Sequence, residues 1–134
     1  MNKLSGFLLG GFAILANLAW ADEGKVLTSV GPVSVVRDGQ ESRLNRGEVV
    51  RTGDLIKVAD DGAAQIRMSD ESIIALSPRT EFKITEYKFA RENPQEGKAL
   101  FALIKGAFRT VTGIIGRQAR ENYAVKAGVV ATIG

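Results

Sequence analysis

The segment AQIRMS at residues 64–69 alternates apolar and polar side chains along its whole length. Successive side chains of a β-strand point to opposite faces of the sheet, so this period of two indicates a strand with one buried face. Ala64, Ile66 and Met68 are therefore expected to face a hydrophobic core. The segment SIIAL at residues 72–76 resumes the pattern after a short polar break and predicts a second strand.

Residues 81–89 form the clearest alternating stretch of the chain. Phe82 and Ile84 share one face of the expected strand, whereas Tyr87 has the opposite parity. One inserted residue moves all following side chains to the other face, so a β-bulge is expected at residues 85–86.

Turn signals rich in Gly, Pro and Asp separate the strand-like segments. They are GP at residues 31–32, DG at 38–39, GD at 53–54, DDG at 60–62, SP at 77–78 and the polar loop at 92–97. The apolar run at residues 98–106 fits either a helix or a strand, and we predict a strand because Gly106 ends it and strand-like residues follow. Residues 113–116 are flanked by glycines and are expected to be flexible. The predicted fold is a single small all-β domain of short antiparallel strands, sandwich-like or solenoid-like, after an N-terminal signal helix.

Residues 1–21 are typical of a secretory signal peptide. Lys3 supplies a positive start, residues 4–18 are uncharged and mostly apolar, and Ala19 and Ala21 place small residues where a signal peptidase reads. We predict cleavage after Ala21, a domain at residues 22–134 and a periplasmic or exported location. The alternative is an uncleaved membrane anchor.

The residue types present exclude most catalytic chemistry. There is no Cys and no His, which removes disulfides, thiolate nucleophiles, imidazole bases and Cys/His metal sites. The adjacent carboxylates at residues 60–61 and 70–71 are interpreted as solvated turn residues, because sequence neighbours point apart. Asp54, which follows Gly53, is interpreted as closing a turn through its side chain. We therefore predict no enzymatic activity, no cofactor and no metal site.

Two groups of basic residues are candidate partner-binding positions. The later group consists of Arg109, Arg117, Arg120 and Lys126, and the earlier one of Arg37, Arg43, Arg46 and Arg51. Guanidinium groups bind carboxylates in a fixed geometry, so the later group is the candidate site for a partner's acidic groups. A mixed, solvated surface is the alternative interpretation. The formal net charge of +3 is too small to indicate a nucleic-acid partner, and we predict none.

The aromatic side chains occur at strand spacing and are interpreted as core residues. They are Phe82, Tyr87, Phe89, Phe101, Phe108 and Tyr123.

The order of several short motifs resembles the FecR-like domain family. The motifs are GPVSVVRDGQ at residues 31–40, LNRGE at 44–48, VRTGDLI at 50–56, AAQIRMSDESIIAL at 63–76 and GAFRTVTG at 106–113. The resemblance covers about residues 25–134. It implies an all-β extracytoplasmic domain without enzymatic activity. In membrane-spanning members, such a domain relays a signal from an outer-membrane iron-siderophore receptor to a cytoplasmic sigma factor.

The sequence departs from the family pattern in three places. Only the predicted signal peptide precedes the domain, which argues against direct contact with a sigma factor. Glu71 stands where the family's turn usually has Gly, which suggests a different turn type. The chain ends at residues 132–134, where the family pattern continues, so we expect the domain to be incomplete at its C-terminus.

The leading functional hypothesis is a non-enzymatic periplasmic sensing or protein-interaction module that binds an envelope protein. Binding is expected through an exposed strand edge or through a polar face containing Arg109 and Arg117. One alternative is a module that binds an envelope polymer or glycan, with peripheral contact to such polymers. The other is an iron-siderophore signalling regulator that acts with a sigma-factor pathway.

Overall fold

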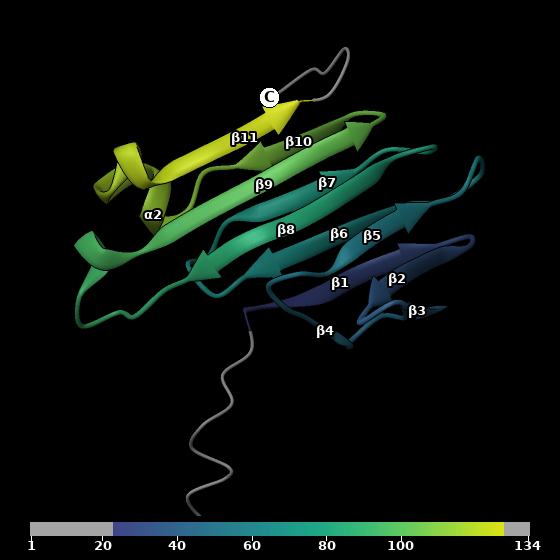
Figure 1. Cartoon of the computed structure of the whole chain (residues 1–134), viewed down its shortest axis with the longest axis horizontal. Helices are drawn as coiled ribbons and strands as arrows, with labels where there is room; N and C mark the ends of the chain where they lie inside the picture. Colours follow the sequence, from purple (N-terminus) through teal and green to yellow (C-terminus); the bar gives the residue numbers. More distant parts are fainter. Residues whose placement is uncertain (1–22, 128–134) are drawn as a thin grey trace, which may run out of the picture.

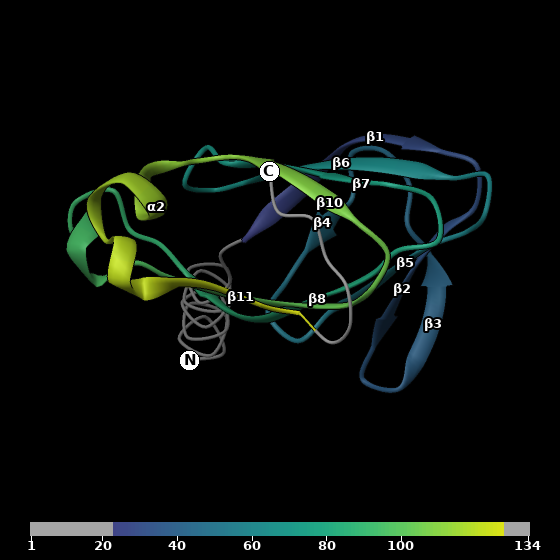
Figure 2. The same ribbon diagram turned by 90° about the horizontal axis from the view of Figure 1, so that it is seen from above.

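The computed structural model describes residues 23–127, which form two β-sheets packed face to face (Figures 1 and 2). The predictions for the signal peptide and for the last residues of the chain lie outside the described residues. Sheet A has the strand order β10-β7-β6-β1-β4, and sheet B has the order β11-β9-β8-β5-β2-β3.

The strands of sheet A are β1 (Gly24–Val30), β4 (Val49–Val50), β6 (Ala63–Met68), β7 (Ile73–Leu76) and β10 (Phe108–Val111). The strands of sheet B are β2 (Val33–Arg37), β3 (Gln40–Arg43), β5 (Leu55–Val58), β8 (Glu81–Lys88), β9 (Lys98–Lys105) and β11 (Tyr123–Ala127). The short helices are η1 (Pro94–Glu96), α2 (Ile114–Gln118) and η2 (Arg120–Asn122). The prediction of an all-β domain is confirmed, and the arrangement is a sandwich.

The alternating segment that opened the sequence argument forms β6 in the middle of sheet A. Ala64, Ile66 and Met68 are buried, whereas Gln65 and Arg67 are exposed, as the period of two predicts. Strand β6 pairs in antiparallel fashion with both β1 and β7. The buried side chains of the two sheets meet in one hydrophobic core.

Two further sequence predictions are confirmed in sheet B. The β8–β9 register shifts between Ile84 and Glu86, which places the expected bulge in β8. The ambiguous apolar run forms strand β9, in which Ala99, Phe101 and Leu103 are buried and the residues between them are partly exposed. The run is therefore a strand with one buried face, and its outer, partly exposed face also carries apolar side chains.

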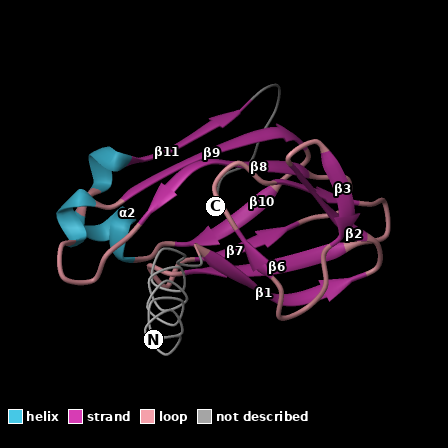
Figure 3. Ribbon diagram, turned by 60° about the horizontal axis from the view of Figure 1, so that its bottom comes forward, coloured by secondary structure: helices cyan, strands magenta, loops and turns pink. Residues whose placement is uncertain are grey.

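The segment between β10 and β11 differs from the sequence prediction. Residues expected to be flexible form helix α2, which lies at one end of the sandwich (Figure 3) and buries Ile115 completely. Because α2 and η2 carry the chain from sheet A to sheet B, β11 runs parallel to β9. All other paired strands are antiparallel, so the expectation of antiparallel strands fails only at this crossover.

Candidate functional site

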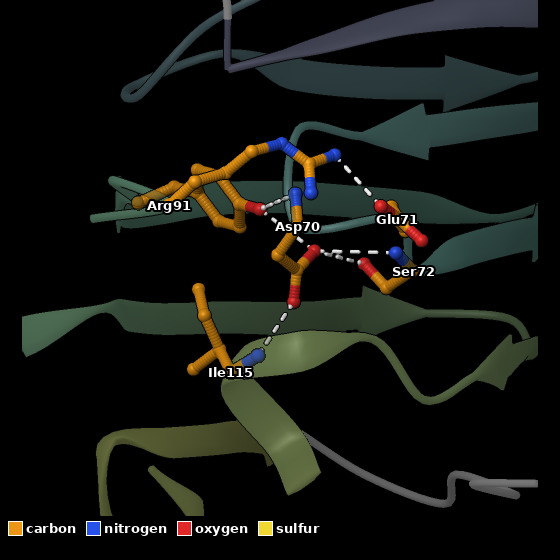
Figure 4. Close-up of polar contacts among 6 residues, drawn as sticks. Asp70, Glu71, Ser72, Arg91 and Ile115 are labelled. Atoms are coloured by element: carbon orange, nitrogen blue, oxygen red, sulfur yellow. Dashed lines mark hydrogen bonds and ion pairs between the residues drawn. The ribbon is translucent and has the colours of Figure 1, made fainter. Parts of the chain in front are cut away.

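The most extensive polar cluster surrounds the carboxylate of Asp70, in the turn between β6 and β7 (Figure 4). The residue is only 1% exposed. Oδ1 accepts hydrogen bonds from the Tyr87 hydroxyl at 2.7 Å and from the Ser72 hydroxyl at 2.7 Å. Oδ1 also accepts the Ser72 backbone N–H at 3.2 Å, and Oδ2 accepts the Ile115 N–H at 3.1 Å.

The backbone of Asp70 makes two further hydrogen bonds to the same neighbours. Its N–H donates to the Tyr87 hydroxyl at 3.0 Å, and its carbonyl accepts the Ile114 N–H at 2.8 Å. Burial, together with the neighbouring Asp70 carboxylate, raises the pKa of Tyr87 and keeps the phenol protonated. These hydrogen bonds link the β6–β7 turn to β8 through Tyr87 and to α2 through Ile115. We call a buried carboxylate that links two elements in this way a brace.

A close approach of backbones completes this brace. A Cβ atom on Gly113, just before α2, would overlap backbone atoms of Asp70 and Ser72. Glycine is therefore required for α2 to reach the turn. The interpretation of residues 70–71 as two solvated carboxylates is wrong for Asp70, because a helix distant in sequence covers it.

Glu71 is exposed, as the sequence analysis expected, but its backbone is unusual. Its φ of 73° is in the left-handed region that favours glycine. The carboxylate forms an ion pair with Arg91 Nη2 at 2.7 Å, and this hydrogen bond lowers the pKa of Glu71.

Asp54 forms a second brace, in the turn before β5. It is 1% exposed and accepts two hydrogen bonds from the Arg37 guanidinium, at 2.9 and 2.7 Å. The Arg51 N–H donates to the same carboxylate at 2.8 Å, as expected for an Asp that closes a turn. The hydrogen bonds that Arg37 donates to Asp54 raise the pKa of the Arg37 guanidinium. Arg37 thus fixes β2 to this turn.

Both oxygens of each carboxylate, Asp54 and Asp70, accept hydrogen bonds from the protein itself. Among residues 23–127, no group of three or more His, Cys, Asp or Glu side chains is arranged to hold a metal ion. A groove of about 680 Å³ on the outer side of sheet B contains the ion pairs Lys57–Glu41, Arg79–Asp60 and Lys105–Glu81. These charged groups are solvated and paired with one another.

The four candidate partner-binding residues are all exposed but do not form one patch. Arg109 lies on β10 and points outward from sheet A, whereas Lys126 lies on β11 and points outward from sheet B. Arg117 and Arg120 lie in the crossover at one end of the sandwich, where Arg117 donates to the Thr112 carbonyl at 2.8 Å.

The edge strands of the two sheets differ in the features that protect them against pairing with another strand. In sheet A the edge strands are β10 and β4, and in sheet B they are β11 and β3. Strand β10 carries Val111, which is 61% exposed. Beneath this edge, Thr110 Oγ1 and the Tyr123 hydroxyl are buried neighbours, and neither makes a hydrogen bond of standard geometry within the described part of the chain.

Comparisons with protein-family models, with curated proteins and with solved structures found no match. In residues 23–127, no helix is both long enough and apolar enough to cross a bilayer. The fold and the braced carboxylates define a small β-sandwich in which the polar clusters serve the structure.

Proposed function

We propose that this chain is a non-enzymatic sensing or protein-interaction module of the bacterial periplasm, similar to FecR-like domains. It binds another envelope protein, which adds a strand to the edge of sheet A at β10. The observation that carries this proposal is the unprotected edge of β10. The saturated buried carboxylates support a binding role over a catalytic one.

The hydrogen-bond register defines which backbone groups this edge presents. The Ser77 N–H donates to the Ala107 carbonyl, and the two residues lie directly opposite each other in the register that continues into β10. Hydrogen-bonded and non-hydrogen-bonded pairs alternate along an antiparallel ladder. Arg109 and Val111 therefore bond to β7, and the backbone groups of Phe108 and Thr110 point away from the sheet.

The other edges carry features that discourage strand addition. Strand β4 has two residues, and β3 is a fully exposed QESR segment with two charges. Strand β11 carries one exposed charge, Lys126, as β10 carries Arg109, but unlike β10 it has no large exposed apolar side chain. Short length and charged side chains are the usual protections of an edge strand. In β10 the only charge is Arg109, and Val111 is an exposed apolar neighbour.

Site-specific photocrosslinking in intact cells tests this proposal. A photoreactive residue replaces Val111 on β10 or, as the matched control, Ser42 on β3. We expect one envelope protein to crosslink at position 111 and not at position 42. Thr110→Pro removes an outward N–H and should abolish that crosslink, whereas Arg43→Pro on β3 should leave it intact.

Two results would contradict the proposal. One is a crosslink of equal yield at both edges, and the other is a crosslink at position 111 that persists in Thr110→Pro. Circular dichroism of each purified variant establishes that the sandwich remains folded.

A further inference from the structure

We infer that β10 recognises an extended partner segment carrying a carboxylate beside Arg109 and a hydroxyl or amide side chain beside Thr110. This inference rests on the proposed strand addition and names the chemistry of the partner. It follows from the alternation of β10, which presents Arg109 and Val111 on the outer side of sheet A and Thr110 on the inner side.

The strands of sheet A carry only positive charges on their outer side, and the acidic residue that interacts with Arg67 is Glu71, in the turn after β6. The charged residues in its five strands are Lys25, Arg67 and Arg109, and none of these strands contains Asp or Glu. Lys25 lies directly opposite Arg67 in the β1–β6 register, an unfavourable pairing of like charges. Arg109 makes no ion pair with any residue of the described range 23–127. A carboxylate on an added strand would supply the missing opposite charge.

The outer side of sheet B shows the contrasting arrangement. Its charged side chains have both signs and form the ion pairs Lys57–Glu41, Lys98–Glu86 and Lys105–Glu81, whereas Lys83, Lys88 and Lys126 make no ion pair within residues 23–127. An anionic segment would meet acidic side chains as well as lysines on this face, whereas the strands of sheet A contain only basic charges. Charge complementarity therefore favours sheet A as the side that meets an acidic partner.

Two buried hydroxyl groups lie at the inner side of β10. The hydroxyls of Thr110 and Tyr123 are buried beside each other, and neither makes a hydrogen bond of standard geometry among the described residues. A strand added beside β10 places one inward side chain directly across from Thr110. A Ser, Thr or Asn at that position would give this pair of hydroxyls a further hydrogen-bond partner.

These requirements define a short sequence pattern. An antiparallel partner strand meets Val111 first, then Thr110, Arg109 and Phe108. Its successive residues are expected to be apolar, hydroxyl- or amide-bearing, acidic and apolar. The exposed Val111 and the core residue Phe108 provide the apolar neighbours at the two ends.

Fluorescence polarisation with two labelled ten-residue peptides tests the pattern. One peptide has a central Val-Thr-Asp-Val, and the other has Lys in place of Asp. We expect the full chain to bind the Asp peptide about tenfold more tightly, since a cross-strand charge reversal changes pairing by about 1–2 kcal/mol. Arg109→Glu should reverse the preference. Lys126→Glu, on the opposite face, should leave it unchanged.

The outcomes separate this inference from the proposed function. If Val111 crosslinks an envelope protein and Arg109→Glu does not alter the peptide preference, the recognition pattern is wrong and strand addition stands. If the crosslink persists in Thr110→Pro, strand addition itself fails, and the pattern fails with it. A crosslink from position 111 to residues 128–134 of the same chain would identify an intramolecular occupant and overturn both.

Discussion

Asp54 and Asp70 are equally buried carboxylates held in different ways. Asp54 is paired with the Arg37 guanidinium, whose side chain is 35% exposed. Asp70 is held by hydroxyl and backbone N–H donors, with no cation in direct contact. The charge of Asp54 is therefore compensated by a partly solvated cation, whereas the charge of Asp70 depends on oriented neutral dipoles. The comparison indicates that loss of Asp70 leaves more buried groups unpaired.

Asp70→Ala is expected to destabilise the fold most, by about 3–5 kcal/mol, because it strips partners from Tyr87, Ser72 and Ile115 together. Urea unfolding followed by circular dichroism measures the effect. Asp70→Asn retains an acceptor oxygen and should cost less than Asp70→Ala. A loss below about 1 kcal/mol in Asp70→Ala would show that the cluster is not a brace.

Asp54→Ala is expected to cost about 2–3 kcal/mol, less than Asp70→Ala, because the freed Arg37 side chain can turn to solvent. The same urea titration gives the difference. Arg43→Ala is the matched control, since Arg43 is an exposed arginine on the adjacent strand β3 without an ion pair among the described residues. Equal losses for Asp54→Ala and Asp70→Ala would remove the distinction between the two braces.

Tyr87→Phe removes one donor to Asp70 and should cost about 1–2 kcal/mol. Tyr87 also gives the fold a dependence on alkaline pH, because burial raises its pKa above the ordinary value of 10.0. The folded state favours the protonated phenol, so this stability is complete below pH 10 and is lost as the pH rises further. Burial raises the pKa of Tyr123 in the same direction. Tyr87→Phe should therefore flatten the alkaline decline only in part, and an unchanged decline would contradict the assignment.

Glu71→Gly is expected to have the smallest effect and to raise stability slightly. Glycine relieves the left-handed backbone at this position, and the Glu71–Arg91 pair that is lost lies in solvent, where it is screened. Thermal unfolding at low and high salt measures the change. Glu71→Gln is the control, because glutamine loses the ion pair but still has the unfavourable positive φ at this position. A clear, salt-dependent destabilisation in both Glu71→Gly and Glu71→Gln would show that the ion pair anchors the loop containing Arg91.

Local patterns predicted the features that depend on neighbouring residues. The alternation in β6 and the change of parity in β8 are visible in the sequence, because side-chain direction follows from position along a strand. The turn at Asp54 was likewise predicted, since its acceptor role toward the Arg51 N–H spans only three residues. The Arg37 partner, 17 residues away, was not predicted.

The sequence by itself predicted a single all-β domain of short strands without Cys or His, and it left a sandwich-like and a solenoid-like arrangement open; the two packed sheets are a result of the tertiary structure. Tertiary structure decided that Asp70 is buried, because the Ile115 N–H reaches it from 45 residues away. It also decided that β11 runs parallel to β9, and that β10 lies at an open edge with Arg109 and Lys126 on opposite faces. These features depend on which distant segments meet, and a local period carries no information about long-range pairing.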